Sequence, residues 1–362
     1  MTVYPADLSR LNKFALRKYV EMEGGADEVQ VITLMDVWPW MHYDFGGSIA
    51  DFKGLNIAAW CPIDHDPAPL NVLQALDHFD ARPIAMSHFG VEKLREAGMD
   101  PLYVPHGVDT TIFQPFSNRD EIRESMKIPQ DAFVVGVVAN NQGIEVPRKS
   151  FPQLLQAFSM FLESHPDAFL YLHTDAFGKN QGLNLIPMVT DVFRIPQDRV
   201  RFVDQDRYWM GQIDWPRMAA IYNSMDVLLN PSMGEGFGVP IIEAQACGTP
   251  VIVTDWTSMP ELVGAGWLVD GDPYYRPPSV AFWKVPAIAE IINALEQAYE
   301  KRGDQEFRNA ARNFALQYDA EYVTTTYWKP VLEALDSPRE VPPLRPIGPN
   351  RAQRRAAKKA KA

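Results

Sequence analysis

The sequence predicts a two-domain α/β protein with parallel sheets. The chain has 362 residues, and at roughly 150 residues per domain this length accommodates two hydrophobic cores. Short apolar segments, which are typical of strands buried on both faces, alternate with segments of helical periodicity. This alternation occurs in two successive series, as expected for α/β layers.

The first series begins with a predicted amphipathic helix over residues 7–23. Apolar residues such as Leu8, Leu11 and Phe14 recur there at helical spacing, and basic residues lie on the other side. Strands and helices then alternate. We expect strands at 29–34, 55–59 and 84–86, with helices at 70–79 and 91–97.

The second series begins with the apolar run 133–139. Its apolar runs again predict buried strands, and the segments between them predict helices. We expect further strands at 169–173, 200–203, 226–230 and 250–254, with helices at 151–163, 215–224, 239–247, 287–300 and 306–335.

The domain boundary is predicted in the polar segment 116–130. This divides the chain into an N-terminal Rossmann-like domain, a C-terminal Rossmann-like domain, closing helices and a disordered basic tail. The expected bounds are 1–117, 118–305, 306–336 and 337–362.

Composition excludes several classes of protein. The net charge is −12, and the basic residues between Arg345 and Ala362 leave the body more acidic still, so we expect no nucleic-acid binding. The two cysteines, Cys61 and Cys247, are far apart and favour a reducing, cytoplasmic location. The N-terminus lacks the pattern of a signal peptide, and no apolar run reaches the length of a membrane span.

The most informative segment is 230–255. After a strand that ends at Asn230, three glycines occur at alternate positions, where the backbone can approach a ligand closely. Pro240 is suited to a first helical turn and Gly248 to a helix end. The segment therefore predicts a βαβ unit that presents a helix N-terminus, which favours an anion such as pyrophosphate.

Two glutamates, Glu235 and Glu243, occur in this unit. A carboxylate beside a phosphate site is suited to binding the hydroxyls of a sugar or a ribose. The alternative is that both glutamates only complement the helix N-terminus. From this loop alone the two readings are equally good.

The segment resembles the signature of glycosyltransferase family 4, the glycogen-synthase-like retaining enzymes with the GT-B fold. That signature has two glutamates separated by seven residues, in a context that is almost complete at 231–251. Other landmarks of the family occur in the expected order. They are 104–109, Arg148-Lys149, 222–226, 260–263 and 266–269. The resemblance covers roughly residues 29–335 and implies two Rossmann-like domains that face each other across a cleft.

The resemblance also implies roles for individual residues. Glu235 would contact hydroxyls of the donor sugar, Glu243 would hold the ribose, and Arg148 and Lys149 would neutralise the diphosphate. Without the resemblance, Arg148-Lys149 is better read as a solvated basic pair. The other donor-binding residues that we expect are Asn140, Gly107, Gly236, Phe237, Gly238 and Val239.

We expect no metal and no other cofactor. Asp-x-Asp occurs three times, at 64–66, 204–206 and 270–272, which is within chance, and a hard cation needs more ligands than a pair of carboxylates. The GT-B resemblance implies cationic side chains in place of the metal.

His65 is the catalytic candidate on the acceptor side, with Asp64 second, because both follow a buried strand at its carboxyl end. The alternative is a loop histidine next to a turn-forming aspartate. His88 and His106 are better explained as structural, and His173 is left open.

The implied function is retaining transfer of a hexose from a GDP- or UDP-type nucleotide sugar to an unidentified acceptor, which could be a glycan, a lipid, a small molecule or a protein. The alternative is an inactive or partner-dependent protein that binds nucleotide sugars. It arises because the first strand and the glycine loop of the family are not found before the helix 7–23, and Gly46-Gly47 comes too late. Membrane-surface contact through the basic helix or tail is a weaker expectation than simple solvation.

Overall fold

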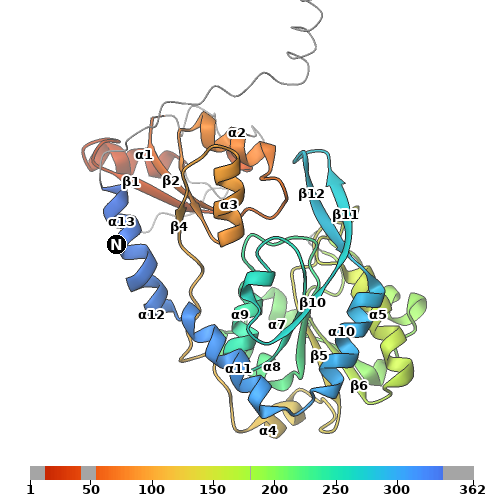
Figure 1. Ribbon diagram of the computed structural model, residues 1–362. Coiled ribbons are helices and arrows are strands. Elements are labelled where there is room, and N and C mark those ends of the chain that lie inside the picture. Colours follow the sequence, from red (N-terminus) through yellow and green to blue (C-terminus); the bar gives the residue numbers. More distant parts are fainter. Residues whose placement is uncertain (1–12, 42–53, 180, 337–362) are drawn as a thin grey trace, which may run out of the picture.

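A computed structural model describes residues 13–41, 54–179 and 181–336 of the chain (Figure 1). Two α/β domains are stacked, with the N-terminal domain and the end of the last helix in the upper part of the view. The two α/β domains with parallel sheets that the sequence predicts are confirmed. The expected basic tail, the glycines at 46 and 47 and residues 7–12 of the predicted helix 7–23 lie outside the described residues.

The N-terminal domain contains a parallel sheet of order β1-β2-β3-β4 in the described part of the chain. The strands are predominantly apolar, and β2 and β3 are mostly buried. Within the described residues the first helix begins at Lys13 and precedes β1, which lies at one edge of this sheet. The elements are α1 (Lys13–Met22), β1 (Gln30–Leu34), a 3₁₀ turn (Trp38–Met41), β2 (Asn56–Cys61), α2 (Leu70–His78), β3 (Arg82–Ala85), α3 (His88–Glu96) and β4 (Leu102–Tyr103).

The C-terminal domain contains a six-stranded parallel sheet of order β10-β9-β8-β5-β6-β7. Every residue of the two strands β5 and β6 is buried, as the continuous apolar runs predict. The strands are β5 (Phe133–Val138), β6 (Ala168–His173), β7 (Val200–Phe202), β8 (Val227–Asn230), β9 (Val251–Thr254) and β10 (Gly266–Val269). The helices are α5 (Phe151–Ser164), α6 (Leu185–Pro187), α7 (Gln205–Trp209), α8 (Trp215–Ser224), α9 (Val239–Ala246) and α10 (Ile288–Glu300).

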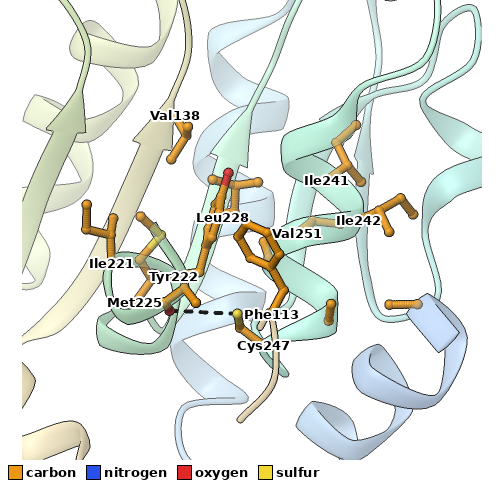
Figure 2. Packing of buried hydrophobic residues seen from close by; sticks show 14 of the residues in the cluster. Phe113, Val138, Ile221, Tyr222, Met225, Leu228, Ile241, Ile242, Cys247 and Val251 are labelled. Carbon is orange, nitrogen blue, oxygen red and sulfur yellow. Dashed lines mark hydrogen bonds between the residues drawn. The ribbon is translucent and has the colours of Figure 1, made fainter. Parts of the chain in front are cut away.

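Each face of this sheet has its own core. Side chains alternate along β5, so that Phe133 and Val135 pack with α5 and α10, whereas Val134 and Val138 pack with α8 and α9. Figure 2 shows the second core, where the ring of Tyr222 lies beside the aromatic and aliphatic side chains of neighbouring elements. This core fixes the position of α9, whose N-terminus faces the other domain.

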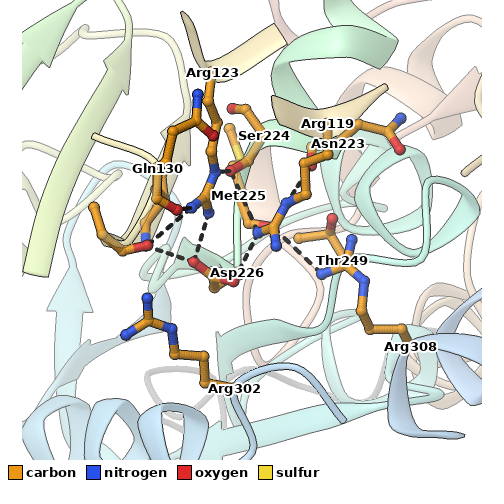
Figure 3. Close-up of polar contacts among 12 residues, drawn as sticks. Arg119, Arg123, Gln130, Asn223, Ser224, Met225, Asp226, Thr249, Arg302 and Arg308 are labelled. Atoms are coloured by element: carbon orange, nitrogen blue, oxygen red, sulfur yellow. Dashed lines mark hydrogen bonds and ion pairs between the residues drawn. The ribbon is translucent and has the colours of Figure 1, made fainter. Parts of the chain in front are cut away.

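The predicted boundary segment 116–130 contains a short helix, α4 (Arg119–Ser125), that is bound to the C-terminal domain. Asp226 accepts hydrogen bonds from Arg119 at 2.7 Å, from Arg123 at 2.8 Å and from the backbone of Val134 at 2.8 Å (Figure 3). The same arginines also bind carbonyls at the end of α8. The linker therefore leaves the N-terminal domain and is fixed at once to the second sheet.

A hairpin between β10 and α10 was not expected from the sequence. Its strands are β11 (Gly271–Arg276) and β12 (Ala281–Pro286), which pair antiparallel and stand up from the second domain (Figure 1). Phe282 exchanges two backbone hydrogen bonds with Asp66, at 2.8 and 3.1 Å, and Ser279 accepts one from Leu70 at 2.9 Å. The hairpin therefore joins the two domains beside the loop that follows β2.

The closing helix predicted at 306–335 is broken into shorter pieces. It consists of α11 (Gln305–Ala315), a 3₁₀ turn (Leu316–Tyr318), α12 (Ala320–Val323), a π-helical segment (Thr324–Trp328) and α13 (Lys329–Leu335). These pieces run from the second domain back to the first. Arg82 binds the carbonyl of Ala334 at 2.8 Å, and Val331 packs against Ile84. The C-terminal helices thus complete the core of the N-terminal domain.

Candidate active site

A cavity of about 300 Å³ lies between the two domains. The N-terminal domain contributes residues from the ends of β1, β2 and β3 and from the turn after β4, and the C-terminal domain contributes the two loops before α5 and α9. The lining residues are Asp36, Pro62, Asp64, Met86, His106, Arg148, Glu235, Gly236, Phe237, Gly238, Val239 and Pro240. The sequence-predicted residues Arg148, Glu235, Gly236, Phe237, Gly238 and Val239 are therefore brought together.

The glycine loop before α9 forms part of the cavity wall on the side of the C-terminal domain. Gly238 is the residue before the helix and has a φ of +117°, which a residue with a side chain rarely adopts. Pro240 lies in the first turn, as predicted. A Cβ at Gly236 would lie 2.1 Å from Cβ of Pro62. The loop was expected to approach a ligand closely, and the structure shows that it also contacts the opposite domain.

Glu235 binds both members of the basic pair. Its Oε2 accepts a hydrogen bond from Arg148 at 2.9 Å, and its Oε1 contacts Nζ of Lys149. Arg148 also donates to the carbonyl of Gly234, and its own carbonyl accepts from Met233 at 2.8 Å. The pair at the start of α5 is thus joined to the signature loop by side chains and backbone, and is not the solvated basic pair of the alternative reading.

The two cations control the ionisation of Glu235. Burial alone would raise the pKa of this carboxyl, but Arg148 and Lys149 outweigh burial and lower it to about 2. The pKa of Arg148 is raised because Glu235 and Asp64 outweigh the effect of burial. Burial and Arg148 lower the pKa of Lys149, against the effect of Glu235. Arg148, Lys149 and Glu235 therefore form a compact ionised cluster that has one excess cation before the neighbouring Asp64 is counted.

Two hydroxyl side chains that sequence reasoning missed hold the signature loop in place. Ser258 donates to the carbonyls of Glu235 at 2.8 Å and Phe237 at 2.7 Å, and Thr257 accepts from the backbone of Glu235 at 3.0 Å. Both residues follow β9 at the carboxyl edge of the sheet. Their place after a predicted strand is the signal that could have identified them.

Glu243 lies on the second turn of α9, and its partner belongs to α8. Its Oε2 accepts a hydrogen bond from the hydroxyl of Tyr222 at 2.7 Å. Burial raises the pKa of the Glu243 carboxyl, and this hydrogen bond only partly opposes the shift. Glu243 does not line the cavity described above. Its role toward a ribose stays a prediction.

His65 and Asp64 form a pair at the acceptor side. His65 Nδ1 lies 2.6 Å from Asp64, and the imidazole stacks on Trp283 of the hairpin with ring centres 4.9 Å apart. Only 6% of His65 is exposed, and it is Asp64 that lines the cavity. Burial alone would raise the pKa of Asp64, but His65 and Arg148 lower it overall. The geometry thus brings Asp64, and not the first candidate His65, to the cavity wall.

Five cavity residues were not singled out for the site from the sequence, namely Asp36, Pro62, Met86, His106 and Pro240. Asp36 follows β1 at its carboxyl end, the same kind of position that identified Asp64, so this signal was available. His106 packs between Trp60 and Phe237, with ring centres at 4.5 and 5.2 Å. Burial lowers its pKa to about 4, so its imidazole is neutral at pH 7.

Two expected donor-binding residues lie elsewhere. Asn140 is exposed after β5 and bonds to Gln142 at 3.3 Å. Gly107 packs against α12, where a Cβ would lie 2.8 Å from Cα of Ala320. Neither lines the cavity. His173 is buried at the end of β6, and burial lowers its pKa to about 4.

In the part of the chain that the structure describes, no group of three or more His, Cys, Asp or Glu side chains is arranged to hold a metal ion. Of the helices in this same part, none has the length and apolar character needed to cross a membrane.

Comparisons with known proteins concern the family and the fold. Residues 131–281 match the family described as glycosyl transferases group 1. A D-inositol 3-phosphate glycosyltransferase from Corynebacterium jeikeium is 29% identical over 257 residues, which cover 66% of this chain and 57% of that protein. The chain spans about half the length of the curated relatives that it matches first.

Two solved structures show the same architecture. Sucrose-phosphate synthase from Thermosynechococcus elongatus has a TM-score of 0.63 and 20% identity, and the match covers 89% of this chain and 77% of that one. The Anabaena protein HepE in complex with UDP-glucose has a TM-score of 0.55 and 19% identity, with 73% and 67% covered. Residues 131–281 thus have the sequence pattern of the group 1 glycosyl transferases, and the chain has the GT-B fold.

Proposed function

We propose that this protein is a glycosyltransferase that uses a nucleotide-diphosphate sugar as donor. One observation carries the proposal: Glu235 lies between Arg148 and Lys149 at the wall of an interdomain cavity that the N-terminus of α9 also lines. Cations and free helical N–H groups together suit a diphosphate, and a carboxylate among them suits sugar hydroxyls.

The donor would occupy the C-terminal side of the cavity. Its diphosphate would lie against Arg148, Lys149 and the first N–H groups of α9, and the sugar against Glu235. Glu243 would hold the ribose, as the resemblance implies. Binding of the diphosphate would replace part of the ion pairing of Glu235, so that the cations exchange one anionic partner for another.

The mechanism that we propose is retaining and needs no metal. The bond between the anomeric carbon and the diphosphate breaks, the bond to the acceptor oxygen forms on the same face, and the acceptor proton passes to the departing diphosphate. Arg148 and Lys149 would stabilise the charge that develops on the leaving group, the kind of electrostatic effect that is usually the largest in enzymes.

The identities of the nucleotide and the sugar are proposed from similar proteins. The Anabaena protein was solved with UDP-glucose, which supports a UDP-type hexose donor, and a GDP-type donor is the alternative. The curated relatives are named for D-inositol 3-phosphate, so this compound and unphosphorylated inositol are a pair of acceptors to test.

The test has two stages. Thermal shift with UDP, GDP, UDP-glucose and GDP-mannose should show a rise in Tm for one nucleotide family, since a ligand stabilises the native state that binds it. Release of the nucleotide should then depend on an added acceptor and persist in EDTA. Binding without turnover against any acceptor would favour the alternative of an inactive or partner-dependent protein, and no binding would refute the proposal.

A further inference from the structure

The N-terminal wall of the cavity is acidic. Five residues of this domain line the cavity, and two of them, Asp36 and Asp64, have carboxyl side chains. Asp36 follows β1 and Asp64 follows β2, and these two strands are adjacent and parallel. Asp36 has an exposed surface, while the surrounding protein and Asp64 together raise its pKa. The two carboxylates therefore act on each other at the wall of the cavity.

The cations of the site compensate this wall only in part, because Arg148, which lowers the pKa of both Asp36 and Asp64, is shared with Glu235. Arg148 is the only cation among the described lining residues, and it is bound to Glu235 and Gly234. Lys149 contacts the same glutamate. In the donor complex proposed above, both would face the diphosphate and not the acceptor.

The remaining N-terminal lining residues bring no positive charge. Met86 and Pro62 are apolar, and His106 is neutral at pH 7 because burial lowers its pKa to about 4. His65 binds Asp64 with its ring stacked on Trp283, and it does not line the cavity.

We propose that the acceptor is uncharged or cationic around its reacting hydroxyl, such as a neutral polyol or an amino sugar, and that Asp36 and Asp64 select against phosphate esters. This rests on the proposed function. Two like charges a few ångströms apart in a partly buried site repel by several times the thermal energy. We therefore expect at least a tenfold preference for the neutral member of a matched pair of acceptors.

The experiment uses the full chain saturated with the nucleotide that stabilises it. Calorimetric titration compares myo-inositol with D-inositol 3-phosphate, and glucosamine with glucosamine 6-phosphate. The phosphate ester should bind at least tenfold more weakly in each pair. Asp36→Asn and Asp64→Asn should each reduce this difference severalfold, whereas the control Asp77→Asn, on the exposed side of α2, should leave it unchanged.

The outcomes separate this inference from the proposed function. If neither UDP nor GDP stabilises the protein, the proposed function fails before any acceptor is tested. If a nucleotide binds but the two members of each pair bind equally, or both undetectably, or the phosphate ester binds more tightly, the selection by Asp36 and Asp64 is refuted. A discrimination that survives both Asn substitutions would also overturn it.

Discussion

Replacement of Glu235 by Gln tests the electrostatic reading of the site most directly. The substitution keeps the shape of the side chain but removes its charge, and it leaves the half-buried Arg148 and Lys149 beside each other without their anion. Breaking a buried ion pair by removing one partner is strongly destabilising, because the remaining charge is uncompensated. We therefore expect loss of stability in addition to loss of any activity.

The magnitude follows from the ionisation of Glu235. Its pKa is lowered from 4.5 to about 2 in the folded protein, which corresponds to about 3 kcal/mol of stability at pH 7. Because the folded pKa is below the unfolded one, this contribution is present above pH 4.5. It is lost as the pH falls from there through about 2.

The assay is urea unfolding of the wild type and the Glu235→Gln variant, followed by circular dichroism and tryptophan fluorescence. At pH 7 the variant should be less stable by about 3 kcal/mol, and the difference should shrink between pH 4.5 and 3. Glu163→Gln, at an exposed position of α5, is the matched control and should change little. Equal stability of Glu235→Gln and wild type at pH 7, or a difference independent of pH, would refute the reasoning.

Three further predictions concern the same cavity. Lys149→Ala should lower turnover at least 100-fold by weakening leaving-group stabilisation, with the circular dichroism spectrum unchanged, and near-normal turnover would exclude the role assigned to Lys149. Gly236→Ala should destabilise the protein by about 1–3 kcal/mol in urea unfolding, because its Cβ would meet Pro62 at 2.1 Å; an unchanged midpoint would contradict this close packing. The ring of His106, whose pKa burial lowers to about 4, should titrate near that pH in NMR spectra, and its contribution to stability, complete above about pH 6.5, should be lost as the pH falls to 4. A midpoint near 6.5 would show that His106 is open to water.

The donor half of the site could largely be anticipated from the sequence. Gly238, Pro240 and Gly248 have local conformational preferences that mark where α9 begins and ends, so the loop that carries Glu235 was predictable. The buried strands β5 and β6 were evident from their continuous apolar runs. The basic pair Arg148-Lys149 was identified through the family resemblance, and the structure adds the contacts that it makes.

The acceptor half could be anticipated only in part. Asp64 was the second candidate and His65 the first, yet the stacking of His65 on Trp283 directs Asp64 to the cavity. The hairpin that carries Trp283 was not expected, because its proline-rich strands have no clear alternation. Asp36 came after a predicted strand but had no motif to single it out.

The sequence alone determined the α/β class, the order of most strands and helices and the loop with Glu235, because these depend on periodicity and on the backbone preferences of glycine and proline over a few residues. The tertiary structure decided which charges meet. Arg148 and Lys149 contact Glu235, and Asp36 and Asp64 share a wall, because parallel strands and two docked domains bring together side chains far apart along the chain. Since electrostatic interaction depends on distance in space and on burial, the ionisation of the site could be known only from the fold.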